Sequence, residues 1–281
     1  SMIFLILTLI FSVLLFVIFR EFSKRNINTF QAITINYLCA GLLALLLTDF
    51  NLIDIKIAVK SSWFIYAVLL GMYFIIMFNV MAKTTQMLGV TISSLSSKMS
   101  LVIPVTAGFF LQNEDPSILK IGAIIMAIFS IYLTISKKEK KNGPIFLAVI
   151  LFFGAGILDT SLSLIQFNFL ETDKEFNLFT STIFFIAFLC GSITLLVTNQ
   201  KLKIKNIIAG ITLGIPNFFS IYFLLKTLDT NDSSILFPIL NIGVVTLSAL
   251  IGWKIYSENL TAKNLAGLIL AGISLAILIY S

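Results

Sequence analysis

The sequence predicts an all-α integral membrane protein, and three observations carry this prediction. Of the 281 residues, 58% are hydrophobic and only 11% are charged, whereas a soluble domain carries about 25% charged residues. The mean hydropathy is +1.04. Apolar stretches of about 20 residues, the length that crosses a hydrocarbon core, follow one another along the whole chain. Most of the exterior must therefore face lipid.

Ten such stretches predict ten transmembrane helices. The first stretch has neither a basic leading region nor a small-residue cleavage site, so we interpret it as a retained helix and not a signal peptide. The least distinct boundary follows the third stretch, where the polar run Lys83-Thr84-Thr85-Gln86 is the only break. The predicted spans cover residues 2–19, 29–48, 63–82, 88–111, 117–136, 144–167, 178–198, 206–226, 233–254 and 261–280.

The basic residues predict an orientation. Most of the 19 Lys and Arg residues lie in the odd-numbered loops between spans, and short positive loops stay in the cytoplasm. We therefore expect both termini outside the cytoplasm, in a multi-pass protein of the cytoplasmic (inner) membrane that is a monomer or a homodimer. The net charge of +6 follows from these loops, so the bilayer, and not nucleic acid, is the expected partner.

The composition also excludes several kinds of chemistry. Histidine is absent, and the two cysteines, Cys39 and Cys190, lie within apolar stretches. This argues against a disulfide framework and against a metal site. No nucleotide-binding or nucleophile-elbow motif is present in the sequence. We therefore expect a protein that is not an enzyme and that needs no cofactor.

The chain divides into two halves of five predicted spans, residues 2–136 and 144–281, joined by a basic linker at 137–143. A shift of about 143 residues brings Gly71 onto Gly214 and Lys98 onto Asn241. An odd number of spans per half makes the halves antiparallel, which is the inverted-repeat plan of many secondary transporters. The sequence thus predicts two inverted five-helix repeats.

Two charged residues, Lys98 and Asp159, lie deep inside predicted spans. Lys98 lies roughly 15 Å from either end of its helix, so a cost of about 2.5–3.5 kcal/mol must be compensated. Three compensations remain open: contact with an acidic group of a substrate, an ion pair with Asp159, or a role in proton coupling. As the acid available within the spans, Asp159 is the coupling candidate, with protons as the coupling ion.

Other polar residues accompany these charges inside the spans. Ser94 and Ser97 belong to a serine cluster around Lys98, and Pro104 should expose a backbone carbonyl beyond it. Each amide in a span is as plausible an interhelical contact as a ligand contact. The remaining candidate substrate-binding residues are Asn36, Asn79, Asn217, Tyr222 and Asn241.

The stretch Gly252-Trp253-Lys254-Ile255-Tyr256-Ser257-Glu258-Asn259-Leu260, continuing to Gly267, resembles the end of the second EamA domain of the drug/metabolite transporter superfamily. Pro104, Glu114 and Gly122 repeat this pattern loosely, although Pro104 is unusually close to Glu114. The resemblance implies ten helices in two inverted halves and a central cavity walled mainly by spans 3, 4, 8 and 9. Members of the superfamily handle amino acids, nucleotide sugars, sugar phosphates, quaternary amines and drugs.

The leading functional hypothesis is a secondary transporter that moves a small polar metabolite by alternating access. Lys98 and Asp159 favour an amino acid, an organic acid or another zwitterion or anion. The alternatives are a sugar-phosphate or nucleotide-type anion exchanger and a broad-specificity drug/metabolite exporter. A lipid flippase-like protein or a membrane enzyme is less well supported, because the loops offer no paired acid and base. Glu114 and Glu258, at span ends, are expected to cap helices or pair with loop lysines.

Overall fold

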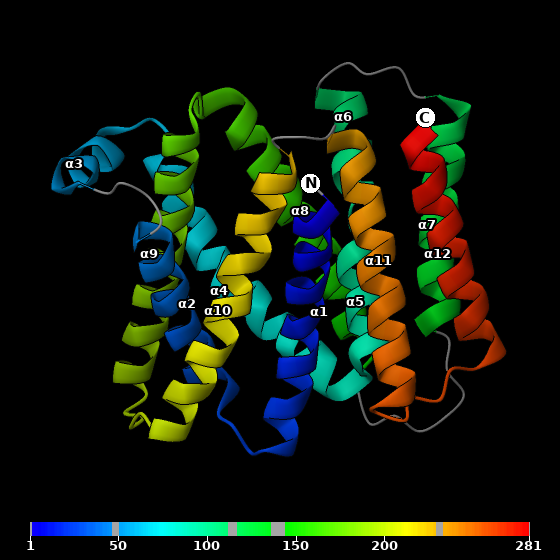
Figure 1. Ribbon diagram of the computed structural model, residues 1–281, viewed down its shortest axis with the longest axis horizontal. Coiled ribbons are helices and arrows are strands. Elements are labelled where there is room, and N and C mark those ends of the chain that lie inside the picture. The colour runs from blue at the N-terminus through cyan, green and yellow to red at the C-terminus, as the bar shows by residue number, and fades with distance from the viewer. Residues whose placement is uncertain (1, 47–50, 112–116, 136–143, 229–232, 281) are drawn as a thin grey trace. The chain divides into compact units, whose positions relative to one another are not determined.

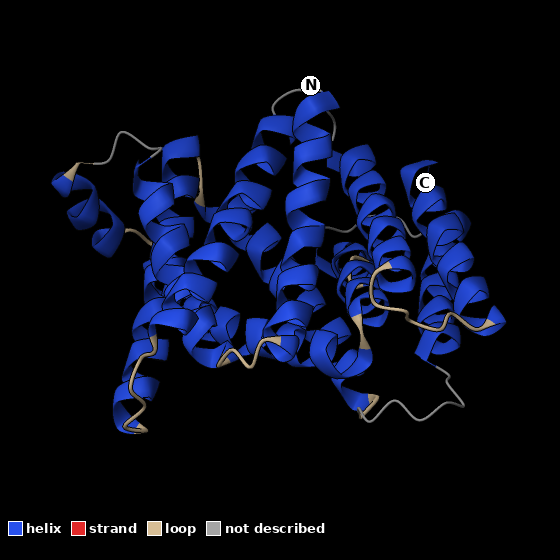
Figure 2. Ribbon diagram, turned by 60° about the horizontal axis from the view of Figure 1, so that its bottom comes forward, coloured by secondary structure: helices blue, strands red, loops and turns tan. Residues whose placement is uncertain are grey.

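The computed structural model describes residues 2–46, 51–111, 117–135, 144–228 and 233–280. The regular structure in these ranges is helical, with short connecting loops (Figure 1, Figure 2). The helices are α1 (Met2–Lys24), α2 (Thr29–Leu46), α3 (Leu52–Lys60), α4 (Phe64–Leu88), α5 (Val90–Met99), α6 (Val102–Leu111), α7 (Ile118–Ile135), α8 (Phe146–Phe169), α9 (Asp173–Val197), α10 (Ile204–Leu228), α11 (Ser233–Lys254) and α12 (Ala262–Tyr280).

Within the described residues, eight helical stretches are long and apolar enough to cross a membrane. They correspond to the predicted spans 1 to 4 and 6 to 9, with α5 and most of α6 counted together as one stretch, Val90–Gly108. The predicted fifth and tenth spans are shorter apolar helices within α7 and α12. The chain is therefore an all-α, multi-pass membrane protein, as its composition predicts.

The predicted end of the third span was wrong, because α4 continues through the polar run to Leu88. The hydroxyls of Thr84 and Thr85 each donate to the carbonyl four residues earlier, at 2.7 Å. These bonds satisfy the polar side chains without interrupting the helix. One residue, Gly89, separates α4 from α5, and its φ of 99° is a conformation that favours glycine.

The predicted fourth span, 88–111, contains a break between α5 and α6, and the stretch Val90–Gly108 is long and apolar enough to be one span. A proline lacks the backbone N–H and its ring crowds the carbonyl four residues earlier. For Pro104 that carbonyl belongs to Ser100, where the break begins. The carbonyl is not left exposed as expected, since it accepts a bond from the backbone N–H of Ile103 at 2.9 Å.

The chain forms two compact units, and each contains a segment from both predicted halves. Unit 1 comprises Ser1–Arg20, Val80–Asp159 and Ser220–Ser281. Unit 2 comprises Glu21–Asn79 and Thr160–Phe219. Both ends of the second segment of unit 2 lie about 140 residues after the corresponding ends of the first. The helices α1, α4, α8 and α10 contribute residues to both units.

In unit 2, two glycines each allow a neighbouring helix to pack closely, and the two contacts have matching distances. A Cβ on Gly71 of α4 would lie 2.7 Å from Cβ of Ile186 and 2.9 Å from the carbonyl oxygen of Ile183, both in α9. A Cβ on Gly214 of α10 would lie 2.7 Å from Cβ of Cys39 and 2.9 Å from the carbonyl oxygen of Asn36, both in α2. Each contact joins a helix of one half to a helix of the other.

In unit 1, α7 and α12 lie side by side (Figure 1), and two side chains of α12 donate hydrogen bonds to carbonyls of α7. The Ser274 hydroxyl donates to the Ala123 carbonyl at 2.7 Å, and the Asn264 amide donates to the Thr134 carbonyl at 2.6 Å. Next to this pair, α5 packs against α11. The apolar side of α5 is held by a buried cluster that includes Leu95, Met99, Ala127, Phe152, Val245 and Ala271.

Candidate functional site

The start of α5 is fixed by a carboxylate from the loop between α11 and α12. Glu258, which is only 4% exposed, accepts hydrogen bonds from the backbone N–H of Val90 at 2.7 Å and of Thr91 at 3.2 Å. The Thr91 hydroxyl donates to the same carboxylate at 2.6 Å. A negative charge at a helix N-terminus satisfies free N–H groups and interacts favourably with the helix dipole. Glu258 is therefore a cap, in agreement with one of the two expectations for it.

Two glycines make room for this carboxylate. A Cβ on Gly89 or on Gly252 would collide with the Glu258 side chain. The described cavity beside Glu258 measures about 10 Å³, which is at the lower limit for a single water molecule. This end of unit 1 is thus a packed junction. Glu114, the expected counterpart of Glu258 in the first half, lies outside the described residues.

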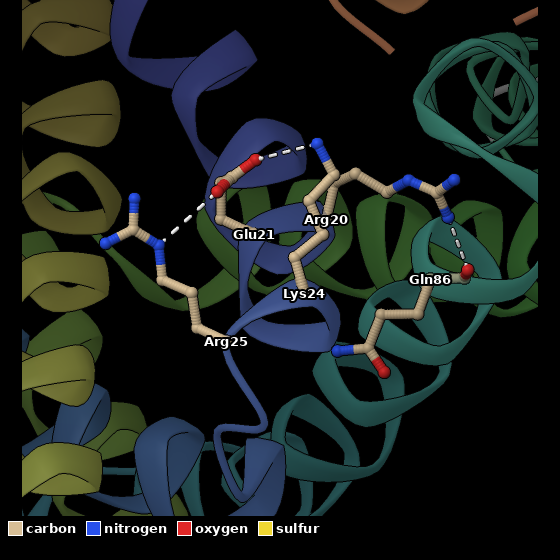
Figure 3. A network of polar contacts seen from close by, with 5 residues as sticks. All are labelled: Arg20, Glu21, Lys24, Arg25 and Gln86. Atoms are coloured by element: carbon tan, nitrogen blue, oxygen red, sulfur yellow. Dashed lines mark hydrogen bonds and ion pairs between the residues drawn. The ribbon is translucent and has the colours of Figure 1, made fainter. Parts of the chain in front are cut away.

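The same unit contains a second polar junction, between α1 and α4 (Figure 3). The Arg20 guanidinium donates to the backbone carbonyl of Gln86 at 2.6 Å. The side-chain amide of Gln86 donates to the backbone carbonyl of Phe19 at 3.2 Å. A cation is favourable there because Gln86 lies in the last turn of α4. Figure 3 also shows ion pairs of unit 2, in which Glu21 contacts Lys24 at 3.5 Å and Arg25 at 3.4 Å.

The two charges that the sequence places inside spans both belong to unit 1. Lys98 lies one residue before the end of α5 and is half-buried, whereas Asp159 lies in α8 and is exposed. The Ser100 hydroxyl, at the helix break, is 3.5 Å from a carboxylate oxygen of Asp159 and donates to the Ser97 carbonyl at 2.5 Å. The structure therefore gathers Lys98, Ser97, Ser100 and Asp159 around the break.

Lys98 and Asp159 attract each other electrostatically without forming a close ion pair. No salt bridge joins these two side chains among the described residues. The Asp159 side chain is exposed, and that of Lys98 is half-buried. A cation and an anion held apart in this way can each bind an opposite charge on a small molecule.

Most of the serines around Lys98 are occupied by bonds within the protein. The Ser94 hydroxyl donates to the Thr91 carbonyl at 3.1 Å, and the Thr85 hydroxyl donates to that of Ser93 at 2.8 Å. The Ser96 hydroxyl is buried and has no hydrogen-bond partner among the described residues. Ser97, beside Lys98, is half-buried. Of the serines predicted to bind a substrate, Ser97 thus has the more accessible side chain.

Asn241 and Tyr222 also lie in unit 1. Asn241 is 9% exposed in α11, the helix that packs against α5. The Tyr222 ring, in α10, contacts the ring of Phe223 edge-on with centroids 5.3 Å apart. Among the described residues, the Asp159 carboxylate accepts a side-chain hydrogen bond from Ser100 and not from Asn241.

The other three predicted site residues lie in unit 2. The Asn217 amide in α10 donates to the side-chain oxygen of Asn36 in α2 at 3.1 Å, beside the close contact of Gly214. The Asn79 amide donates to the Ile75 carbonyl of its own helix at 2.7 Å. The bond between Asn217 and Asn36 is the interhelical alternative that the sequence left open, whereas the bond of Asn79 to its own helix is neither of the two alternatives considered. The amide nitrogen of Asn36 is buried without a further partner among the described residues.

Comparison with known proteins extends the description of the chain without assigning an activity. No family model matches the chain. The chain is similar to an uncharacterized protein of Haemophilus influenzae, with 26% identity over 279 residues. The alignment covers 94% of this chain and 93% of the relative. The similarity therefore extends over both predicted halves and both units of this multi-pass membrane protein.

Proposed function

We propose that the chain is a secondary transporter of a small polar metabolite that carries an acidic group. The observation that carries the proposal is the pair of opposite charges, Lys98 and Asp159, beside the break between α5 and α6. Charged residues inside spans are costly and mark substrate or ion pathways. Broken helices near the middle of the membrane are a recurring feature of transporter binding sites.

The packing of unit 2 supports an inverted repeat of five and five spans, as in the drug/metabolite transporter superfamily. Gly71 and Gly214, which a shift of 143 residues brings together, make contacts of matching distance with α9 and α2. The residues that these glycines contact are also related by one shift. Ile183 and Ile186, beside Gly71, lie 147 positions after Asn36 and Cys39, beside Gly214. Repeats related by a two-fold axis produce such exchanged contacts.

The charges favour a substrate that is an amino acid, an organic acid or another zwitterion or anion. Lys98 would contact the acidic group, because an ammonium donates up to three hydrogen bonds and has no close ion partner among the described residues. Asp159 would contact an amino group or carry the coupling proton. The superfamily resemblance and a location in the cytoplasmic (inner) membrane belong to the same proposal.

A ligand screen with the purified protein tests the proposal. Compounds that bind the folded state raise its stability, by about 2.7 kcal/mol at a concentration of 100 times Kd. We expect small acids or zwitterions to raise the unfolding temperature of the wild type and of Lys83→Met, which removes an exposed lysine of the same unit. The Lys98→Met variant should lose this response. Equal stabilisation of all three proteins by the same acid would contradict the role of Lys98.

A further inference from the structure

The short helix α3 lies between two candidate spans and is too short to be one itself. It follows α2 after five residues and precedes α4 after three. At no more than about 3.6 Å per residue, α3 cannot leave the neighbourhood of these two span ends. The 18 residues of α2 rise about 27 Å, close to the thickness of the hydrocarbon core. Chain continuity therefore places α3 at the boundary between hydrocarbon and headgroups.

One side of α3 is fixed to α9 by a buried acid. Asp54 is 2% exposed, and its carboxylate pairs with the Lys174 ammonium of α9 at 2.8 Å. The second carboxylate oxygen accepts the backbone N–H of Asn51 at 2.9 Å. The hydrogen bond from Lys174, followed by that from Asn51, holds the pKa of Asp54 below its ordinary value. Ala58, one turn after Asp54, is buried on the same side.

The remaining sides of α3 carry exposed apolar and basic residues. Ile55 and Val59, four positions apart on one face, are 50% and 55% exposed, and Ile57 is 47% exposed. Lys56 and Lys60, also four positions apart, share the face opposite the buried side. Neither lysine has an ion partner among the described residues. Ile57 lies on the other flank of the two lysines, so the apolar face of α3 consists of Ile55 and Val59. An apolar face next to a basic face is typical of helices that lie in the plane of a membrane interface.

We propose that α3 is an interfacial helix that inserts Ile55 and Val59 into the lipid and binds anionic phospholipid headgroups through Lys56 and Lys60. Burial of the apolar face gains hydrophobic free energy, and lysines next to an anionic surface add electrostatic attraction. The Asp54–Lys174 pair fixes the rotation of the helix, so that the apolar face remains available for lipid. The transport proposal plays no part in this inference.

Site-specific labelling of the reconstituted full-length chain tests the inference. An environment-sensitive fluorophore is attached at Val59→Cys or at Lys56→Cys, in a background with Cys39→Ala and Cys190→Ala. Vesicles contain phosphatidylcholine alone or with phosphatidylglycerol. We expect the Val59 label to be quenched severalfold more strongly by spin-labelled lipid, and less strongly by aqueous iodide, than the Lys56 label. Its emission should shift further to the blue when phosphatidylglycerol is present.

Charge variants test the headgroup part of the inference. Lys56→Gln with Lys60→Gln should abolish the effect of phosphatidylglycerol on the Val59 label. Lys201→Gln with Lys203→Gln, which removes two exposed charges from another loop of unit 2, should preserve the effect. Equal iodide quenching at Val59 and Lys56 would overturn the lipid-facing assignment. Efficient disulfide cross-linking of unlabelled Val59→Cys chains would also overturn it, because a second copy would then cover the face.

Discussion

Removal of the Glu258 carboxylate should destabilise the protein through the start of α5. The carboxylate accepts two backbone N–H groups and one hydroxyl, all within 3.2 Å, and it is 4% exposed. In Glu258→Ala, the two N–H groups lose their partner in a site with little room for water. In Glu258→Gln, a side-chain oxygen remains as an acceptor, but the negative charge at the helix N-terminus is lost.

The expected magnitudes follow from these contacts. A buried donor left without a partner costs about 1–3 kcal/mol, so two donors predict a loss of about 2–6 kcal/mol for Glu258→Ala. The charge–dipole contribution in a partly buried site is at most about 2 kcal/mol, so Glu258→Gln should lose about 1–2 kcal/mol. Because α5 carries Lys98, both variants should also bind substrate more weakly than the wild type.

Unfolding in mixed detergent micelles, followed by the reactivity of Cys39 and Cys190 towards a thiol dye, measures these losses, since both thiols are free and only partly exposed. Glu171→Gln, which removes an exposed loop carboxylate, is the matched control and should change the stability by less than about 0.5 kcal/mol. A Glu258→Ala variant as stable as this control would refute the assignment of Glu258 as the cap of α5.

Three further predictions concern other parts of the chain. Gly214→Ala should destabilise the protein by about 1–3 kcal/mol because its Cβ would overlap α2, whereas Gly122→Ala, which meets open space, should be neutral or stabilising in the same unfolding assay. The hydrogen bond from Lys174 lowers the pKa of Asp54. The contribution of this pair to stability should therefore be fully present above the ordinary aspartate pKa of about 3.9 and should be lost only as the pH falls below it. Release of α3 near pH 6, detected with a label on that helix, would contradict this prediction. If Asp159 carries the coupling proton, substrate uptake by the Asp159→Asn variant should not depend on a pH gradient. Uptake into liposomes with the same pH dependence as the wild type would rule out a coupling role for Asp159.

Much of the fold could be predicted because lipid imposes a simple pattern on the sequence. Each of the ten predicted apolar stretches contains a helix, and eight helical stretches in the described residues are long enough to span. The helix α3 was missed because nine residues with mixed polarity carry no span-length signal. The extension of α4 through Thr84 and Thr85 was missed because a polar run indicates a loop unless the bonds of its side chains to the helix backbone are known.

The candidate site was predictable only in its charged residues. Lys98 and Asp159 stand out because charge inside a span must be compensated, and the structure places both in unit 1 near Ser100. The bond between Asn36 and Asn217 depends on the close approach of α2 and α10, which a sequence does not specify. The carboxylate of Glu258 reaches Val90 and Thr91 from nearly 170 positions further along the chain, and no local pattern indicates this contact.

Counterflow in liposomes tests the central claim most directly. Vesicles containing the purified protein are loaded with an unlabelled acid identified by the ligand screen, and entry of the labelled compound is followed over time. The account predicts saturable, transient accumulation for the wild type and for Lys83→Met, and none above empty vesicles for a folded Lys98→Met. Wild-type counterflow by Lys98→Met would contradict the assignment of Lys98, and non-saturable entry through the wild type would contradict a carrier.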